Sequence, residues 1–220
     1  CFYIKKQKYR VSSGFLFKFK GRKMIKKIIT FFSALFLLCF QSVKAEEMYV
    51  GIDYLKNTID TGITNISSNL DEDDEGYSLY AGWPINENLD IEASYQDFGE
   101  ASLSGVSGNQ FKYEGTTYEF NTTATLAASA TSFGFAAKPK FEISDGVMLY
   151  GKLGFHNWKS DLSITATTVT ASADEKGTDV FYGGGIQVSL ENLNGRVGYS
   201  KFDLDGDDVG SINVGLSYSF

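Results

Sequence analysis

The stretch Ile212-Asn213-Val214-Gly215-Leu216-Ser217-Tyr218-Ser219-Phe220 decides the fold class. Successive side chains of a β-strand point to opposite faces, so its large apolar residues share one face and its small or polar residues share the other. A strand with one apolar and one polar face is typical of a barrel that crosses a bilayer, with lipid outside and a polar lumen inside. This stretch therefore predicts one strand of a transmembrane β-barrel.

The same alternation recurs along residues 46–220, where no segment keeps a helical period. It predicts eight strands, near residues 47–60, 75–84, 88–101, 125–141, 146–163, 177–190, 193–204 and 209–220. Three links are short turns, and four are longer or strongly polar, near 61–75, 102–124, 164–177 and 204–208. Short periplasmic turns, longer extracellular loops and an even strand count describe an all-β, eight-stranded antiparallel up-and-down transmembrane barrel. We expect the strands on either side of 102–124 to extend above the membrane as a hairpin.

The two faces of the predicted strands differ in polarity. Nearly every charged strand residue falls on the inward face, including Asp53, Glu92, Lys138, Lys152 and Arg196. A water-soluble barrel of the lipocalin type would show the opposite pattern, with an apolar interior. Aromatic residues near strand ends are expected in the girdles at the two membrane surfaces, and these are Tyr54, Trp83, Tyr95, Trp158, Tyr182, Tyr199 and Tyr218.

The first 45 residues differ in character from the rest of the chain. Residues 24–45 have the three parts of a secretory signal peptide: basic Lys26 and Lys27, an apolar stretch at 28–40, and a cleavage site between Ala45 and Glu46. A membrane anchor is the alternative, but the apolar stretch is short for the ~20 residues that a spanning helix needs. We interpret residues 1–23 as an upstream extension outside the native protein, and 46–220 as the mature barrel.

The charge is unevenly distributed. Residues 1–45 carry 11 of the 20 basic residues and none of the 27 acidic ones, so 46–220 has a formal charge of −18. A domain this acidic argues against nucleic acid as a partner. Both cysteines, Cys1 and Cys39, precede residue 46, which leaves no disulfide or thiolate metal site in the barrel. The acidic stretches 71–75 and 203–208 are predicted to be solvated loops with, at most, weak divalent-cation bridging to lipopolysaccharide, so no cofactor or metal site is expected.

Three segments resemble the OmpA-like transmembrane domain of Gram-negative outer membranes: 147–161 (VMLYGKLGFHNWKSD), 180–199 (VFYGGGIQVSLENLNGRVGY) and 214–220 (VGLSYSF). The resemblance implies a minimal monomeric barrel in the outer membrane, without a periplasmic domain, in contact with lipid and lipopolysaccharide. It implies insertion by the barrel-assembly machinery, with Leu216, Tyr218 and Phe220 as the signal. It also implies a lumenal ion-pair network, whose positions here are Asp53, Glu92, Lys138, Lys152, Gln187 and Arg196.

These features predict a structural and interactional role, in which the barrel supports the envelope and its loops bind a host or surface partner. Tyr113, Tyr118 and Phe120 alternate with polar residues in the longest loop, and exposed aromatic side chains suit adhesion. A narrow gated pore or small-solute channel that uses the same lumenal charges is the first alternative.

A lipid A-modifying enzyme is the second alternative. His156 is the only histidine, with Ser160 and Asp161 close by in sequence. Its context at 155–158 does not resemble the deacylase motif, and its side chain is predicted to point inward, away from lipid. We therefore expect no enzyme.

Overall fold

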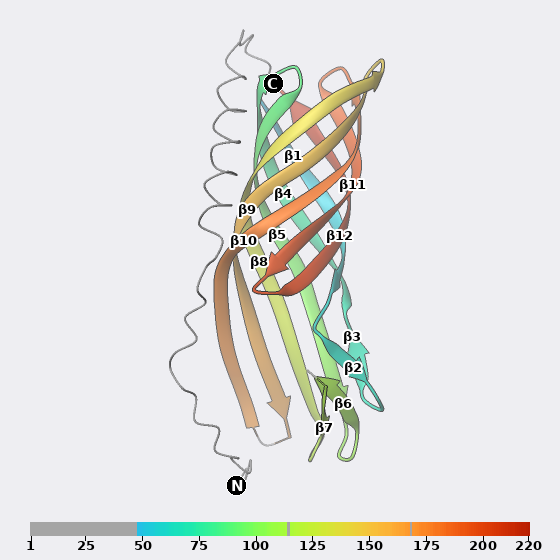
Figure 1. Ribbon diagram of the computed structural model, residues 1–220, viewed down its shortest axis with the longest axis vertical. Helices are drawn as coiled ribbons and strands as arrows, with labels where there is room; N and C mark the ends of the chain where they lie inside the picture. Colours follow the sequence, from blue (N-terminus) through green and yellow to red (C-terminus); the bar gives the residue numbers. More distant parts are fainter. Residues whose placement is uncertain (1–47, 114, 168) are drawn as a thin grey trace. The chain divides into compact units, whose positions relative to one another are not determined.

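The computed structural model describes residues 48–113, 115–167 and 169–220 (Figure 1). The predicted signal peptide at 24–45, its cleavage site and the extension at 1–23 lie outside these residues. The strands are β1 (Tyr49–Ile59), β2 (Ile63–Asn65), β3 (Asn69–Asp71), β4 (Asp73–Asn86), β5 (Leu89–Gly105), β6 (Gln110–Tyr113), β7 (Thr116–Glu119), β8 (Ala124–Ser144), β9 (Val147–Ala166), β10 (Val169–Leu190), β11 (Leu193–Leu204) and β12 (Asp207–Ser219). The described part of the chain holds no helix long and apolar enough to cross a membrane.

Eight of these strands form one closed barrel. Hydrogen bonds join them in the order β5-β4-β1-β12-β11-β10-β9-β8, and pairing of β5 with β8 completes the ring. All neighbours are antiparallel, and the first and last strands of the barrel meet through Tyr49 and Ser219. The predicted eight-stranded antiparallel barrel is confirmed.

Burial follows the predicted alternation, because outward side chains lie on an open surface and inward ones fill the lumen. On β12, Leu216 is 56% exposed and Val214 is 55% exposed, whereas Asn213 and Ser217 are each 6% exposed. Trp158 is an exception to the predicted girdle, since it points inward and is only 5% exposed. Trp158 lies two residues from inward His156 on the same strand, so the alternation of that strand predicts an inward side chain at Trp158.

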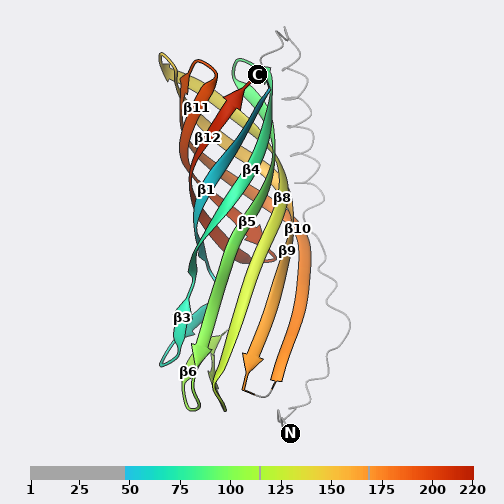
Figure 2. The ribbon, with the colours of Figure 1, turned by 180° about the vertical axis from the view of Figure 1, so that it is seen from behind.

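The long links of the sequence are more ordered than predicted. The link predicted at 164–177 is wrong: β9 and β10 pair as far as Ala166 and Val169, so the connection spans residues 167 and 168. Short polar residues alternate there with small ones, and a strand outside lipid needs no apolar outer face. Figures 1 and 2 show β5, β8, β9 and β10 running well past the β11–β12 turn.

The link at 102–124 forms a hairpin, but it is not a continuation of the barrel ladder. β5 and β8 stay paired up to Gly105 and Ala124. Beyond them β6 pairs with β7, and β2 from the 61–75 link adds a third strand through Ile63 and Tyr113. A separate three-stranded sheet therefore lies at the extracellular end. The sequence analysis predicts the hairpin at 102–124 but not the third strand that joins it.

Candidate functional site

Arg196 is the centre of a charged layer in the lumen. Its Nε donates to Asp53 Oδ1 at 2.8 Å, and its Nη2 donates to Asp53 Oδ2 at 2.5 Å. Its Nη1 donates to Glu92 Oε2 at 2.8 Å, and Glu92 Oε1 accepts a hydrogen bond from Lys152. Arg196, Asp53 and Glu92 are each less than 5% exposed. The two-pronged contact with Asp53 is the strong, directional form of an arginine–carboxylate pair.

Lys138 links the remaining predicted residue to this layer. Its Nζ donates to Gln187 Oε1 at 2.9 Å and to the Tyr49 hydroxyl at 3.1 Å. The same ammonium lies 3.7 Å from Asp90 Oδ2, and Asp90 Oδ1 lies 2.8 Å from Lys140 Nζ. The structure therefore brings together all six predicted lumen residues in one layer, with carboxylates and cations alternating.

Sequence reasoning missed four members of this layer. Tyr150 belongs to the layer because Lys138 Nζ lies 5.1 Å from the centroid of its ring. Asp90, Tyr49 and Tyr150 each lie two residues from a predicted inward position on their strands, so strand parity could have identified all three. Lys140 lies two residues beyond inward Lys138 and could have been found in the same way.

Tyrosine rings and glycines fill the space around the charges. The Arg196 guanidinium carbon lies 3.3 Å from the centroid of the Tyr80 ring, and Lys138 Nζ lies 4.8 Å from that of Tyr49. A Cβ built on Gly51 would collide with the Tyr80 ring, and one built on Gly82 would collide with the Tyr49 ring. Each ring thus occupies the place that a side chain would take on the neighbouring strand.

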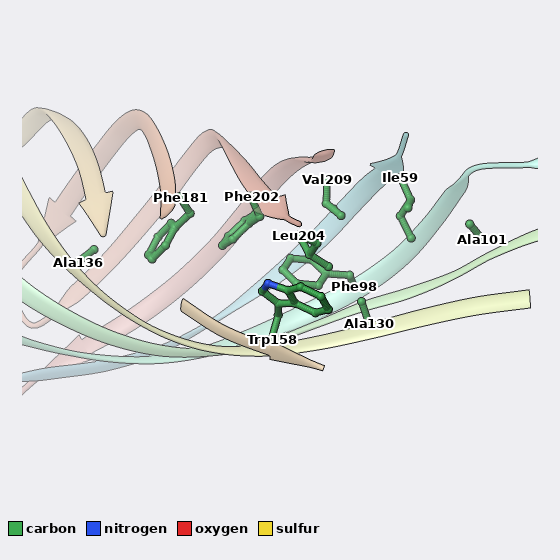
Figure 3. Close-up of a cluster of buried hydrophobic side chains, with 10 residues drawn as sticks. All are labelled: Ile59, Phe98, Ala101, Ala130, Ala136, Trp158, Phe181, Phe202, Leu204 and Val209. Carbon is green, nitrogen blue, oxygen red and sulfur yellow. The ribbon is translucent and has the colours of Figure 1, made fainter. Parts of the chain in front are cut away.

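An aromatic layer, whose side chains are drawn in Figure 3, follows the charged layer toward the extracellular end. Phe181 and Phe202 stack at 5.0 Å between ring centroids with 13° between their planes, and Phe98 meets Phe202 edge-on at 4.9 Å. Trp158 belongs to the same cluster and donates from Nε1 to Asp179 Oδ2 at 2.7 Å. With charges on one side and packed rings on the other, the lumen is filled by two successive layers.

His156 contributes to the aromatic layer. It is 1% exposed and lies edge-on to Phe202, and its Nε2 is 2.9 Å from the Asp203 carbonyl oxygen. Asp161 instead pairs with Lys159 at 2.6 Å on the exposed outer face. The structure thus does not join His156 and Asp161 in a catalytic arrangement.

The longest strands reverse their polarity above the aromatic layer. On β9 the outward side chains change from Phe155, which is 66% exposed, to Asn157 and Lys159. The inward side chains of the same strand change from His156 to Leu162 and Ile164. Since alternation is unbroken, the outer face becomes polar and the inner face becomes apolar at the same height.

The neighbouring strands reverse at the same height. Asn157 pairs with Phe133 on β8 and with Thr178 on β10, and the Thr178 hydroxyl donates to Asn157 Oδ1 at 2.7 Å. On the outward face of β8, Thr131 follows Phe133 toward the extracellular end. The height of Asn157 marks the outer edge of the lipid-facing surface, because outer side chains are apolar on the periplasmic side of it and polar on the extracellular side.

The apolar inner face of these extensions lines a pocket of about 420 Å³. Its floor is shared with the aromatic layer and includes Trp158, Ala130 and Val209. Its walls carry Leu162 and Ile164, which are 38% and 45% exposed. No direct signal for this pocket is present in the sequence, because the pocket depends on the extended pairing of segments that are predicted to be loops.

The three-stranded sheet carries exposed aromatic side chains beside this pocket, and Tyr113 is also one of the residues that line it. Phe111 stacks on Tyr118 at 5.5 Å with 18° between the rings, and Phe120 adds a third ring at 5.4 Å from Phe111. Phe120 is 6% exposed, whereas Tyr118 is 46% and Tyr113 is 41% exposed. Of the three aromatic residues predicted to be available for adhesion, two are exposed and Phe120 is buried.

Comparison with known proteins agrees with this architecture. The attachment invasion locus protein of Yersinia enterocolitica is 25% identical over 201 residues, which cover 89% of this chain and 100% of the relative. Outer membrane protein A of Klebsiella pneumoniae is 23% identical over 171 residues, covering 72% of this chain and 45% of the relative, so the chain spans less than half of that protein.

A solved structure shares the fold. The attachment invasion locus protein of Yersinia pestis, in complex with the heparin analogue sucrose octasulfate, aligns with a TM-score of 0.51 at 19% identity, covering 80% of this chain and 99% of the other. These relatives confirm the resemblance to small OmpA-like barrels. Since the outer membrane protein beta-barrel domain family matches residues 30–220, the chain belongs to that family and is an integral, multi-pass protein of the Gram-negative outer membrane.

Proposed function

We propose that this protein is a closed barrel that presents an adhesive surface on the three-stranded sheet β2-β6-β7. The observation that carries the proposal is the exposure of Tyr113 and Tyr118 on a sheet built outside the polarity reversal. Aromatic side chains of this kind supply large contact area at low conformational entropy cost, so they are frequent anchors of protein interfaces. The name of the Yersinia enterocolitica relative, attachment invasion locus protein, supports the same role.

Charge narrows the class of partner. The sequence ranges 60–75, 100–124, 159–176 and 201–208 hold sixteen acidic and four basic residues. Such a surface repels polyanions, so the partner is a neutral or basic polypeptide and not a sulfated polysaccharide. In this respect it differs from the Yersinia pestis relative, which was solved with a heparin analogue.

Binding of bacteria to host-cell or matrix-protein surfaces tests the proposal. We expect Tyr113→Ser with Tyr118→Ser to reduce adhesion about tenfold, as loss of two interface anchors would. The matched control is Thr165→Ser with Thr170→Ser on the β9–β10 hairpin, which should adhere like the parent, and added heparin should not compete. Equal adhesion of the tyrosine variant, at equal surface display, would overturn the proposal.

The terminal segment supports a second, assembly-related proposal. Leu216, Tyr218 and Phe220 all point outward and are 49–63% exposed, and Tyr218 meets Phe220 edge-on at 5.4 Å. These outward side chains are available to the barrel-assembly machinery. Replacing Phe220 by Ser should lower the amount of folded barrel in the outer membrane, with Phe141→Ser, an exposed site on β8, as the control.

A further inference from the structure

The pocket at the extracellular end has an unusual combination of surfaces. Its walls are aliphatic, yet Leu162 and Ile164 remain open to solvent at 38% and 45%. Apolar side chains that face water inside a concave site gain free energy when an apolar group displaces that water. A volume of about 420 Å³ suits a small molecule or one aliphatic chain.

Acidic groups form the rim of the pocket. Glu175 and Asp207 belong to its lining, which includes no lysine, arginine or histidine. Burial and the nearby carboxylates of Asp60, Glu175, Asp205 and Asp208 raise the pKa of Asp207. Asp208 is itself paired with Lys201 at 2.6 Å, so the negative potential at the rim comes mainly from the other carboxylates.

We propose that this pocket binds a cationic amphiphile, with its aliphatic chain against Leu162, Ile164 and Trp158 and its protonated amine beside Glu175 and Asp207. An aliphatic carboxylate of the same length fits the walls but meets like charges at the rim. A neutral alcohol fits the walls without the electrostatic gain. Tyr113 lines this pocket and also belongs to the proposed adhesive surface. The variants that test the two proposals alter different residues, so the two proposals can still fail independently.

The chain offers its own probe for the test. Trp83 and Trp158 are its only tryptophans, and Trp83 faces outward at 39% exposure. In a Trp83→Phe barrel, held in nanodiscs of zwitterionic lipid, fluorescence therefore reports on the floor of the pocket. Titration with octylamine, octanol and octanoate compares the three head groups on one chain length.

We expect saturable binding of octylamine, with an affinity about tenfold above that of octanol and higher again than that of octanoate. Glu175→Gln with Asp207→Asn should remove the preference for the amine and leave octanol binding unchanged. Ala128→Phe, which places a ring on the pocket side of β8, should abolish binding of both. Thr125→Phe on the opposite face of the same strand is the matched control and should bind like the parent.

Several outcomes would overturn the proposal. Equal affinity for the three head groups, a preference for octanoate, or no saturable response would each contradict a cation site. Retained octylamine binding in Ala128→Phe would show partition into lipid instead. A barrel that binds only a basic, apolar peptide and not octylamine would also exclude the small amphiphile.

Discussion

Arg196 shows how one side chain can hold a lumen together. It is the common partner of Asp53 and Glu92, and all three are buried. Removing it leaves two carboxylates with reduced compensation in a low-dielectric interior, which is far more destabilising than loss of an exposed pair. The cost of removing Arg196 therefore comes mainly from the buried carboxylates of Asp53 and Glu92 that would remain.

Arg196→Ala should lower the free energy of unfolding by about 3–5 kcal/mol. Urea titration of the barrel in detergent, read by heat-modifiable gel mobility, measures this. Lys159→Ala is the control, because it breaks the exposed Lys159–Asp161 pair and should change stability by less than ~1 kcal/mol. Similar losses for the two variants would mean that burial adds little to the lumenal pairs.

Asp207 makes a prediction about pH. Its raised pKa means that the folded protein holds this proton more tightly than the unfolded chain does. The ionised group is therefore destabilising above its folded pKa, and the effect disappears as pH falls toward the ordinary value of 3.8. Asp207→Asn should raise the melting temperature at neutral pH but not in acid. A pH-independent difference would contradict this.

At the scale of the element, strand parity explains what the sequence could predict. Alternation identified eight strands, their lipid-facing sides and the inward charges, since lipid and lumen impose opposite polarities. Alternation of apolar and polar residues does not identify strands above the membrane, because neither face of a strand has to contact lipid there. For that reason the sequence predicts a loop at 164–177 and does not predict the pocket that depends on the pairing of this segment.

The β9–β10 hairpin should behave as paired strand and not as a loop. Trypsin added to intact cells should leave the bonds after Lys159 and Lys176 uncut, because both lysines lie in the hydrogen-bonded ladder and pair with each other. Ala171→Pro removes an amide donor from β10 and should make the segment cleavable. Rapid cleavage of the parent protein at Lys176 would favour the loop interpretation.

At the scale of the whole molecule, closure of the lumen is shared between two different chemistries. The charged layer around Arg196 and the ring layer around Phe181 and Phe202 lie at successive heights. Since the two layers lie at different heights, loss of either one leaves the other in place. We therefore expect the parent barrel to be electrically silent.

Planar-bilayer recording tests this arrangement. Arg196→Ala alone and Phe181→Ala with Phe202→Ala should both remain silent, and the triple variant should show stepwise conductance. Stepwise currents through the parent protein would favour a narrow pore. Currents through Arg196→Ala alone would show that the ring layer does not seal the lumen.

The pairing of rings with glycines has a consequence for how such barrels diverge. Tyr80 fills the space above Gly51, Tyr49 that above Gly82, and Trp158 that beside Gly177, where an added Cβ would lie 2.6 Å from the indole. Two neighbouring strands therefore share the interior space, with a ring on one and a glycine on the other. The large and the small residue of such a pair can be exchanged only together. A substitution at one member of a pair leaves a clash or a void, whereas a matched change at both members keeps the interior filled. Interiors can therefore stay full while sequence identity falls.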